Sequence, residues 1–367
     1  MQIDFANLKI QHKLYKEEIE EAILKVARDC NFIMGSQIDE LERSLEKFTG
    51  SKYAISCSSG TDALLLAMMA LDIQPDDEII TTPFTFFATA ETIAFLKAKP
   101  VFVDIDEKTY NIDPKKIEEK ISSKTKAIIP VSLYGQPCDM DEINQIAKKY
   151  NLKVIVDGAQ SFGSTYKGES DSNLGDISCT SFFPAKPLGC YGDGGALFTN
   201  DEKLADKIKS LRLHGQSIRY HHKYIGMGGR LDTIQAAVLN VKLKYYPKDL
   251  KLRQDVAAKY TQALNAKNIE TPFVKNDRTS AWAQYSIRVQ NRTELQTKLQ
   301  NLGIPTAVHY PMPLHVQECF KYLNLKEGDF PISEKVSKEI MSLPMNPYVS
   351  DEEIEFIVGS LAKELRC

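Results

Sequence analysis

Segments with helical periodicity alternate with short apolar runs along the first two thirds of the chain, and this alternation restricts the possible folds most. The apolar residues from Ile38 to Phe48 step by three and four, as on the buried face of a helix. Helices that alternate with buried strands predict an α/β domain whose mostly parallel sheet carries helices on both faces. Seven short apolar runs are candidate strands: 53–57, 79–82, 101–104, 127–131, 153–157, 177–183 and 196–199.

The pattern changes near Pro247. A long helical pattern should end there, because proline restricts the residue before it, and a new charged helix should follow. We therefore divide the chain into a large α/β domain, 1–246, and a smaller C-terminal α+β domain, 247–367. The smaller domain should contain a strand over 282–289 and a terminal helix that begins at Asp351.

Charge and composition exclude several classes of function. The 46 basic and 49 acidic residues leave a net charge of −3, so no global positive field attracts nucleic acid or an anionic membrane. The chain shows no basic-then-apolar leader and no membrane-spanning run, so we expect a cytoplasmic protein. The seven cysteines form no C-x-x-C pair, which favours reduced thiols, and the six histidines follow no metal-ligand spacing, so we expect no metal site.

Lys186 is the first candidate for chemistry. It follows the mostly apolar run 181–185 and precedes glycine-rich sequence. A lysine with apolar neighbours can lose its proton and attack a carbonyl carbon, as the lysines that form Schiff bases with pyridoxal phosphate (PLP) do. The alternative is an ordinary lysine in a surface loop.

Asp157 is the second candidate. It ends the apolar run 153–157, which is typical of a buried parallel strand. Open α/β sheets bind ligands at the carboxyl ends of such strands, and a carboxylate beside a pyridine nitrogen would keep that nitrogen protonated. The same side chain could equally cap the turn that follows.

A turn of small polar residues, 58–61, follows one candidate strand and precedes an apolar helix. Free backbone N–H groups at a helix N-terminus favour an anion such as phosphate, and the Ser59 and Thr61 hydroxyls add donors. A Ser/Thr-Gly sequence here is also a common helix N-cap. The turn matches neither the dinucleotide-binding nor the P-loop glycine pattern.

In order and spacing, these segments resemble the DegT/StrS family of nucleotide-sugar aminotransferases, which use PLP and have the aspartate aminotransferase fold, fold type I. The resemblance covers nearly the whole chain. It implies a seven-stranded type of sheet and a homodimer with active sites at the subunit interface. Six segments carry it: 59–64, 83–86, 157–160, 181–186, 192–195 and 308–311.

The resemblance also implies roles for single residues. Lys186 would form the Schiff base with PLP, and Asp157 would pair with the pyridine nitrogen. Residue chemistry alone leaves open a core position for Phe86, a solvated loop amide for Gln160 and a backbone-bonded hydroxyl for Ser181. The family pattern places the remaining cofactor contacts as follows: Gln160 near the ring hydroxyl, Phe86 on the ring face, and Ser59, Gly60, Thr61 and Ser181 around the phosphate.

One segment departs from the family pattern. The family usually has Gly-x-Asn-x-Arg where this chain has Gly-Met-Gly-Gly-Arg at 226–230. Gly228 thus replaces an Asn that reaches the phosphate of the partner subunit's PLP. Because glycine has no side-chain donor, that contact must be lost or be made by backbone, water or another residue.

The segment 212–224 is basic and aromatic, which suits the diphosphate of a sugar nucleotide, although a solvated surface loop has the same composition. We take Arg219 as a substrate-binding candidate on that ground. Arg230, His309 and Tyr310 are further substrate-side candidates.

The resemblance implies transfer of an amino group from glutamate to a nucleotide-linked keto sugar. The chain looks most like the members that aminate carbon 3 of a UDP-linked N-acetylhexosamine or its uronic acid, in bacterial surface polysaccharide or lipopolysaccharide biosynthesis. The alternatives are a carbon 4 aminotransferase for a UDP- or dTDP-4-keto-6-deoxy sugar, a PLP lyase, dehydratase or desulfurase of the same fold, and a non-catalytic PLP-binding sensor. Family dehydratases of sugars carry histidine in place of the lysine, so Lys186 argues against that branch.

Overall fold

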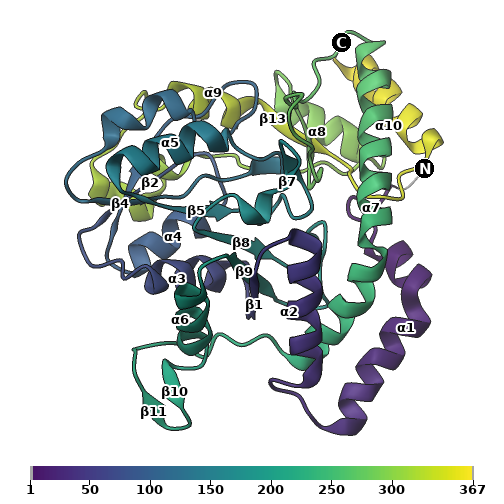
Figure 1. Cartoon of the computed structure of the whole chain (residues 1–367). Helices are drawn as coiled ribbons and strands as arrows, with labels where there is room; N and C mark the ends of the chain where they lie inside the picture. Colours follow the sequence, from purple (N-terminus) through teal and green to yellow (C-terminus); the bar gives the residue numbers. More distant parts are fainter. Residues whose placement is uncertain (1–2, 366–367) are drawn as a thin grey trace.

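One seven-stranded sheet organises most of the chain in the computed structural model, which describes residues 3–365 (Figure 1). Its order is β1-β9-β8-β5-β4-β2-β3; β9 runs antiparallel to both neighbours and the other pairs are parallel. The predicted sheet is confirmed. Its strands are β1 (Tyr53–Cys57), β2 (Glu78–Thr81), β3 (Lys99–Phe102), β4 (Thr125–Ile128), β5 (Lys153–Asp157), β8 (Ile177–Ser181) and β9 (Gly195–Thr199).

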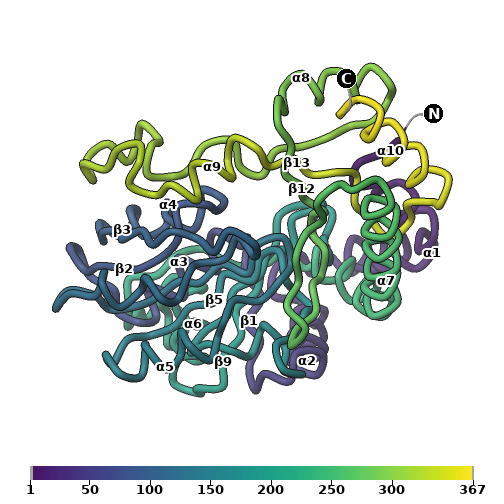
Figure 2. Tube along the Cα trace, turned by 90° about the horizontal axis from the view of Figure 1, so that it is seen from above, coloured from purple at the N-terminus to yellow at the C-terminus, as the bar shows by residue number. Residues whose placement is uncertain are grey.

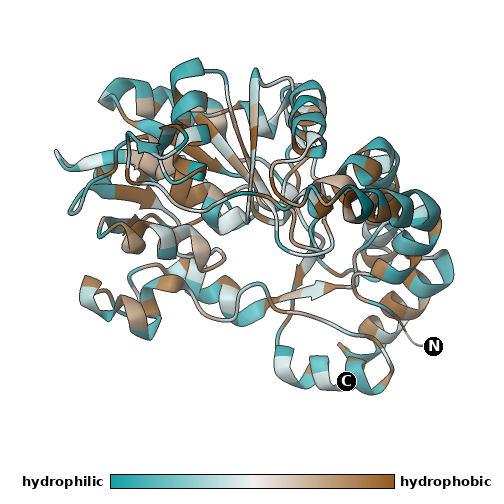
Figure 3. Ribbon diagram, turned by 90° about the horizontal axis from the view of Figure 1, so that it is seen from below, coloured by the Kyte–Doolittle hydropathy of each residue, from teal (hydrophilic) through white to brown (hydrophobic). Residues whose placement is uncertain are grey.

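Helices cover both faces of this sheet because the strands are apolar on both faces. Ile155 packs with α3 and α6 on one side, whereas Val154 and Val156 pack with α5 on the other. Figure 3 shows the apolar strands inside and the hydrophilic residues on the outer helix surfaces. The helices of this part are α1 (Leu8–Asp29), α2 (Ser36–Thr49), α3 (Gly60–Ala70), α4 (Ala88–Phe95), α5 (Met140–Tyr150), α6 (Glu202–Arg212) and α7 (Thr233–Asn265).

The C-terminal part has its own apolar cluster around two antiparallel strands, β12 (Tyr285–Arg288) and β13 (Ile340–Leu343). Figure 2 shows this pair with α8 (Arg292–Asn301) and α10 (Asp351–Glu364) at one end of the molecule. The predicted α+β character and the helix start at Asp351 agree with these elements. Shorter elements are α9 (Pro331–Glu339), the hairpin β6 (Thr165–Tyr166) with β7 (Glu169–Ser170), the hairpin β10 (Gln216–Ile218) with β11 (His221–His222), and the 3-10 helices η1 (Pro114–Lys116), η2 (Glu118–Lys120), η3 (Leu133–Gly135), η4 (Asp171–Asn173), η5 (Leu314–Val316) and η6 (Glu318–Leu323).

The expected helix end at Pro247 is wrong, because α7 continues through Pro247 to its end at Asn265. A proline inside a helix costs about 3 kcal/mol, but contacts on both sides of it hold this helix. The Tyr246 hydroxyl donates to the Phe162 carbonyl at 2.5 Å, and the Tyr15 hydroxyl donates to Asp249 at 3.1 Å. Tertiary packing therefore outweighs the local break.

The division into domains 1–246 and 247–367 thus passes through the interior of one helix, and it stays a proposal. Residues 1–2 and 366–367, at the outer ends of these domains, lie outside the described residues. Within residues 3–365, no helix has both the length and the apolar character needed to cross a membrane.

Candidate active site

Six of the seven strands of the large sheet point the same way, so their carboxyl ends share one edge. The turns after these strands carry most of the predicted cofactor-side residues, and the fold brings them to one place. Ser59, Gly60 and Thr61 follow β1, Phe86 follows β2, Gln160 follows Asp157 at the end of β5, and Lys186 follows Ser181 at the end of β8.

Asp157 is buried at the end of β5. Its Oδ2 accepts a hydrogen bond of 2.8 Å from the Thr89 hydroxyl, and its Oδ1 accepts one of 3.2 Å from the Ala159 amide. Burial raises the pKa of Asp157, while these bonds and the charge of Lys186 oppose the rise. The bond to Ala159 shows that Asp157 does cap the turn that follows, which the sequence left open as an alternative role. The same carboxylate also interacts electrostatically with Lys186.

Lys186 lies in a loop that folds back on itself after β8. The Lys186 amide donates to the Phe183 carbonyl at 2.8 Å, and the Cys190 amide donates to the Phe182 carbonyl at 2.7 Å. The lysine is half-buried, unlike an ordinary surface lysine. Burial lowers the pKa of Lys186, and Asp157 partly offsets this effect. A lower pKa increases the fraction of neutral amine, the form that attacks carbonyl carbons.

The N-terminus of α3 forms a cradle against the end of β8. The Ser59 hydroxyl caps the helix by accepting from the Asp62 amide at 3.0 Å, so the amides of Gly60 and Thr61 are left without an acceptor among residues 3–365. A Cβ built on Gly60 would lie 2.7 Å from the Ser181 Cβ, so only glycine allows this approach. Two free amides, a helix dipole and the nearby hydroxyls fit a phosphate.

Gln160 is buried and uses both ends of its amide. Its Oε1 accepts from the Tyr134 amide at 2.7 Å, and its Nε2 donates to the Tyr310 hydroxyl at 3.1 Å. The alternative of a solvated loop amide therefore does not hold. The Tyr134 hydroxyl also donates to the His309 carbonyl, so the turn after β4 connects Gln160 to the 309–310 segment.

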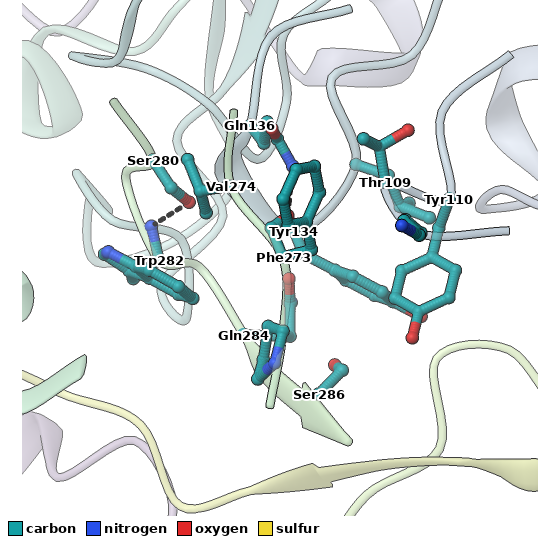
Figure 4. Close-up of a pocket in the computed structure, with 13 residues that line it drawn as sticks. Thr109, Tyr110, Tyr134, Gln136, Phe273, Val274, Ser280, Trp282, Gln284 and Ser286 are labelled. Carbon is teal, nitrogen blue, oxygen red and sulfur yellow. Dashed lines mark hydrogen bonds between the residues drawn. The ribbon is translucent and has the colours of Figure 1, made fainter. Parts of the chain in front are cut away.

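Tyr134 also lines a narrow pocket between the large sheet and the segment that leads into β12 (Figure 4). Gln136, Phe273 and Gln284 contribute to its walls. Within that segment, the Ser280 hydroxyl accepts from the Trp282 amide at 3.1 Å. Tyr134 thus stands where the two parts of the chain meet.

His309 and Tyr310 come from the C-terminal part and respond to the same charges as the sheet residues. Burial and the charge of Lys186 lower the pKa of His309 to about 4, and the His309 Nδ1 lies 2.9 Å from the Ser342 hydroxyl on β13. Burial and the charge of Asp157 raise the pKa of Tyr310. Both side chains are therefore neutral hydrogen-bonding groups near pH 7.

Phe86 lies at the rim of this site. It is 54% exposed, whereas Phe84 is fully buried. The centroid of the Phe86 ring lies 6.0 Å from that of the Tyr310 ring, and the two planes are tilted by 41°. The buried core position that was the alternative for Phe86 is therefore taken by Phe84 instead. The Phe86 ring is largely exposed at the rim.

The segment 226–230 passes beside the cradle, because the Ser58 amide donates to the Gly229 carbonyl at 3.1 Å. Arg230 is half-buried next to it. A Cβ built on Gly228 would lie 3.1 Å from a carbon of the His214 ring. The glycine that replaces the family's Asn thus leaves room for this histidine.

Arg219 does not join the site within one chain. It lies at the exposed tip of the β10–β11 hairpin, which projects from the body below α6 (Figure 1). Its guanidinium carbon lies 5.1 Å from the centroid of the Tyr220 ring. The sequence could not show this direction, because a basic aromatic loop looks the same whether it folds over a site or away from it.

Sequence reasoning missed three residues that hold the predicted ones: Thr89, Tyr134 and Ser342. Thr89 had a weak signal, since it stands four residues after Thr85, and the two hydroxyls lie 3.0 Å apart. Tyr134 follows the end of a candidate strand, as the site residues do. Ser342 lies inside a strand of the C-terminal part, so nothing local linked it to His309.

A half-buried lysine, a buried strand-end carboxylate and an anion cradle at the carboxyl edge of this sheet define a PLP-binding enzyme of fold type I. The free amides of the cradle and the lowered pKa of Lys186 both fit that group. The chain belongs to the DegT/DnrJ/EryC1/StrS aminotransferase family, whose model matches residues 13–362.

Two relatives illustrate the similarity. A UDP-2-acetamido-2-deoxy-3-oxo-D-glucuronate aminotransferase from Pseudomonas aeruginosa is 50% identical over 98% of this chain and 99% of its own length. A UDP-N-acetyl-3-dehydro-alpha-D-glucosamine 3-aminotransferase from Acidithiobacillus ferrooxidans is 37% identical over 99% of this chain and 98% of its own.

Solved structures agree with the fold. A DegT/DnrJ/EryC1/StrS aminotransferase from Brucella abortus matches with a TM-score of 0.96 and 38% identity, over 99% of this chain and 100% of its own. The NtdA protein of Bacillus subtilis, solved with bound cofactor PMP, the amine form of PLP, matches with a TM-score of 0.92 and 31% identity, over 100% of this chain and 86% of its own. The predicted fold class, aminotransferase activity and PLP cofactor are confirmed.

Proposed function

We propose that this aminotransferase moves an amino group from glutamate to carbon 3 of a UDP-linked 2-acetamido-2-deoxy-3-keto-hexose or its uronic acid. The strongest support is the 50% identity, over nearly the full length, to a relative named for that uronate reaction. A second relative is named for carbon 3 of the hexosamine. We place the reaction in the cytoplasm, in the supply of amino sugars for surface polysaccharide or lipopolysaccharide.

PLP, when bound, supplies an electron-withdrawing ring through which an amino group can leave one carbon and join another. Lys186 would hold it and then carry a proton at its Nζ between substrate and cofactor carbons. Asp157 would keep the pyridine nitrogen protonated, since a nearby negative charge favours the protonated form. The backbone of Gly60 and Thr61 would hold the phosphate, with help from the Ser181 hydroxyl.

On the substrate side, neutral groups would orient the sugar. Tyr310 keeps its proton and accepts from Gln160, so its hydroxyl can donate to a sugar oxygen. His309 stays neutral because of its low pKa, so it offers a hydrogen bond without placing a second cation beside Lys186. Arg230, beside the cradle, is the cation available to a diphosphate or uronate within the same chain.

The proposal includes a homodimer. The β10–β11 hairpin carries Arg219 away from its own site, together with the exposed apolar side chains Ile218 and Tyr220. A second copy would cover these side chains and receive the cation at its own site. We expect Arg219→Ala to raise the KM for the sugar nucleotide and to leave the absorbance of bound cofactor unchanged. An unchanged KM would remove Arg219 from the substrate site.

The decisive experiment separates the two halves of the reaction. Purified holoenzyme should convert glutamate to 2-oxoglutarate without any sugar, and Lys186→Ala should lower this rate at least about 100-fold because it lacks the proton-carrying amine. Lys244→Ala, which removes an exposed lysine of α7, is the matched control and should behave as wild type. Equal rates for wild type and Lys186→Ala would refute the role of Lys186.

A panel of UDP- and dTDP-keto sugars then identifies the acceptor by the mass of the aminated product. We expect the UDP-linked 3-keto sugars to be preferred. Preference for a 4-keto-6-deoxy sugar would favour the carbon 4 alternative. No 2-oxoglutarate from glutamate and no product with any acceptor would favour the sensor alternative.

A further inference from the structure

A second carboxyl group lies buried behind Asp157. Asp171, at the start of η4, is 1% exposed. Its Oδ2 accepts a hydrogen bond from the Ser161 hydroxyl, whereas its Oδ1 has no direct partner among residues 3–365. The Ser164 hydroxyl is also buried without a direct partner among these residues, and the Ser132 hydroxyl makes no hydrogen bond of ordinary geometry although it lies close to the Asp171 carboxyl. Buried polar atoms that lack protein partners are typical of a site that encloses an ordered water.

The three groups are neighbours. The Asp171 amide donates to the Ser164 carbonyl at 3.0 Å, and the Ser132 hydroxyl is near enough to lower the pKa of the Asp171 carboxyl. The same cluster touches Asp157, because the Ser132 amide donates to the Asp157 carbonyl at 3.0 Å. A Cβ built on Gly158, the next residue, would lie 3.5 Å from the Asp171 Oδ2.

Three titratable groups from three segments face Asp171. Asp157 faces it from β5, Arg278 from the segment before β12, and the Cys138 thiol from the segment before α5. Arg278 already pairs with Asp139 at 2.9 Å and with Asp277 at 2.7 Å. Burial raises the pKa of Asp171 to about 6, and the charge of Asp157 adds to the rise.

We propose that Asp171 is a positioning residue that acts through Asp157, with an enclosed water joining its free oxygen to Ser132 and Ser164. This proposal rests on the cofactor-side role of Asp157 given above. Below about pH 6 Asp171 is neutral, and above it a second negative charge stands behind the site. That charge should increase the proton affinity of the ring nitrogen of bound cofactor, which would face Asp157.

Infrared difference spectroscopy of the cofactor-free protein tests the charge. As the pH is raised, the wild type should lose a protonated-carboxyl band with a midpoint near pH 6. Asp171→Asn should lack this band at every pH. Asp157→Asn should keep the band but lower its midpoint by about one pH unit, because a like charge is gone. Asp141→Asn, which removes an exposed carboxylate paired with Lys167, is the matched control and should leave the midpoint unchanged.

Ser161→Ala provides a second variant that keeps the carboxyl. Loss of its donor should raise the midpoint, and this remains measurable if Asp171→Asn fails to fold. A band that persists in Asp171→Asn, or a midpoint that neither Asp157→Asn nor Ser161→Ala moves, would overturn the proposal. A high-resolution crystal structure should show a water within hydrogen-bonding distance of Ser132, Ser164 and Asp171. If no water lies there, the enclosed-water part of the proposal is wrong.

The holoenzyme gives the link to the cofactor. In Asp171→Asn, the pH midpoint of the cofactor absorbance should fall relative to wild type, and an unchanged midpoint would mean that the charge does not reach the site. Failure of the proposed function is distinguishable: it would appear as no amino transfer by the wild type, and the infrared results on the cofactor-free protein would be unaffected.

Discussion

Lys186, Asp157 and His309 lie where burial is the largest influence on each pKa: it raises that of the acid and lowers those of the two bases. The electrostatic interactions among these three groups shift the pKa values less than burial does. At the scale of single residues, the site therefore favours a neutral amine and a neutral imidazole beside an acid that needs hydrogen bonds to stay charged. Thr89 and the Ala159 amide supply those bonds.

Lys242 on α7 gives a prediction at this scale. It is buried, it donates to the Gly189 carbonyl in the loop of Lys186, and burial lowers its pKa to about 8. The unfolded chain then binds more protons than the folded one between about pH 8 and the ordinary lysine value of 10.5, so stability should rise with pH in that window. The rise should reach about 3 kcal/mol, since one pKa unit corresponds to about 1.4 kcal/mol.

Chemical denaturation of Lys242→Met and wild type between pH 7 and 10.5 measures this rise. The variant should lack it, so its stability relative to wild type should fall as the pH increases. Lys244→Met, which removes an exposed lysine two residues along the same helix, should follow the wild-type curve at every pH. A difference between Lys242→Met and wild type that does not depend on pH would contradict the expectation.

At the scale of elements, the cradle depends on how closely α3, β8 and β9 approach one another. Gly60 meets Ser181 on β8, and a Cβ built on Gly195 of β9 would lie 2.4 Å from the Ser59 carbonyl oxygen. Backbone atoms cannot move aside as a side-chain end can. The two glycines therefore set the position of the helix N-terminus and of its free amides.

We expect Gly195→Ala to destabilise the protein by about 1–3 kcal/mol and to weaken cofactor binding, because the added methyl group forces α3 away from β9. Gly359→Ala in α10 is the matched control. Among residues 3–365, no atom outside its own stretch of helix lies within 4 Å of a Cβ built there, and alanine in a helix should add about 0.5–1 kcal/mol. Denaturation and cofactor titration measure both variants, and a neutral Gly195→Ala would show that the contact relaxes easily.

At the scale of the whole molecule, the C-terminal part contributes residues to the site, whereas the β10–β11 hairpin projects away from it. His309 and Tyr310 reach the carboxyl edge of the sheet through contacts with Tyr134 and Gln160. The hairpin region instead exposes apolar side chains, with Ile225 92% exposed. Such side chains on a projecting hairpin indicate a contact with another chain.

If the proposed homodimer forms through this hairpin, Ile225→Glu should weaken it about 100-fold, since burying an unpaired charge at an interface costs several kcal/mol. Sedimentation over a range of concentrations measures the dissociation constant. Leu302→Glu, at an exposed position at the end of α8, is the control and should leave it unchanged. A monomeric wild type, or an Ile225→Glu dimer as strong as wild type, would contradict the expected interface.

Pattern and chemistry predicted much of the fold, and they also gave candidate site residues that the fold brings to one edge of the sheet. The strand 153–157, the strand 53–57 and the helix start at Asp351 coincide with the observed elements, because a buried strand or a capped helix leaves a local signal. The helix end predicted at Pro247 was wrong because the effect of this proline on α7 depends on packing partners that are distant in sequence. The direction of Arg219 was equally hidden, because a loop's composition does not encode where it points.

The amino-acid sequence by itself determined the α/β class, the strand that ends in Asp157, the segment that carries Lys186, and the glycine-bearing turn of the cradle, since each depends on neighbours along the chain. Only the tertiary structure decided that Tyr134 and Ser342 hold His309, that Asp171 lies behind Asp157 and that the hairpin points away. Those relations join segments far apart in sequence, and burial, which sets their pKa values and contacts, exists only once the chain has folded.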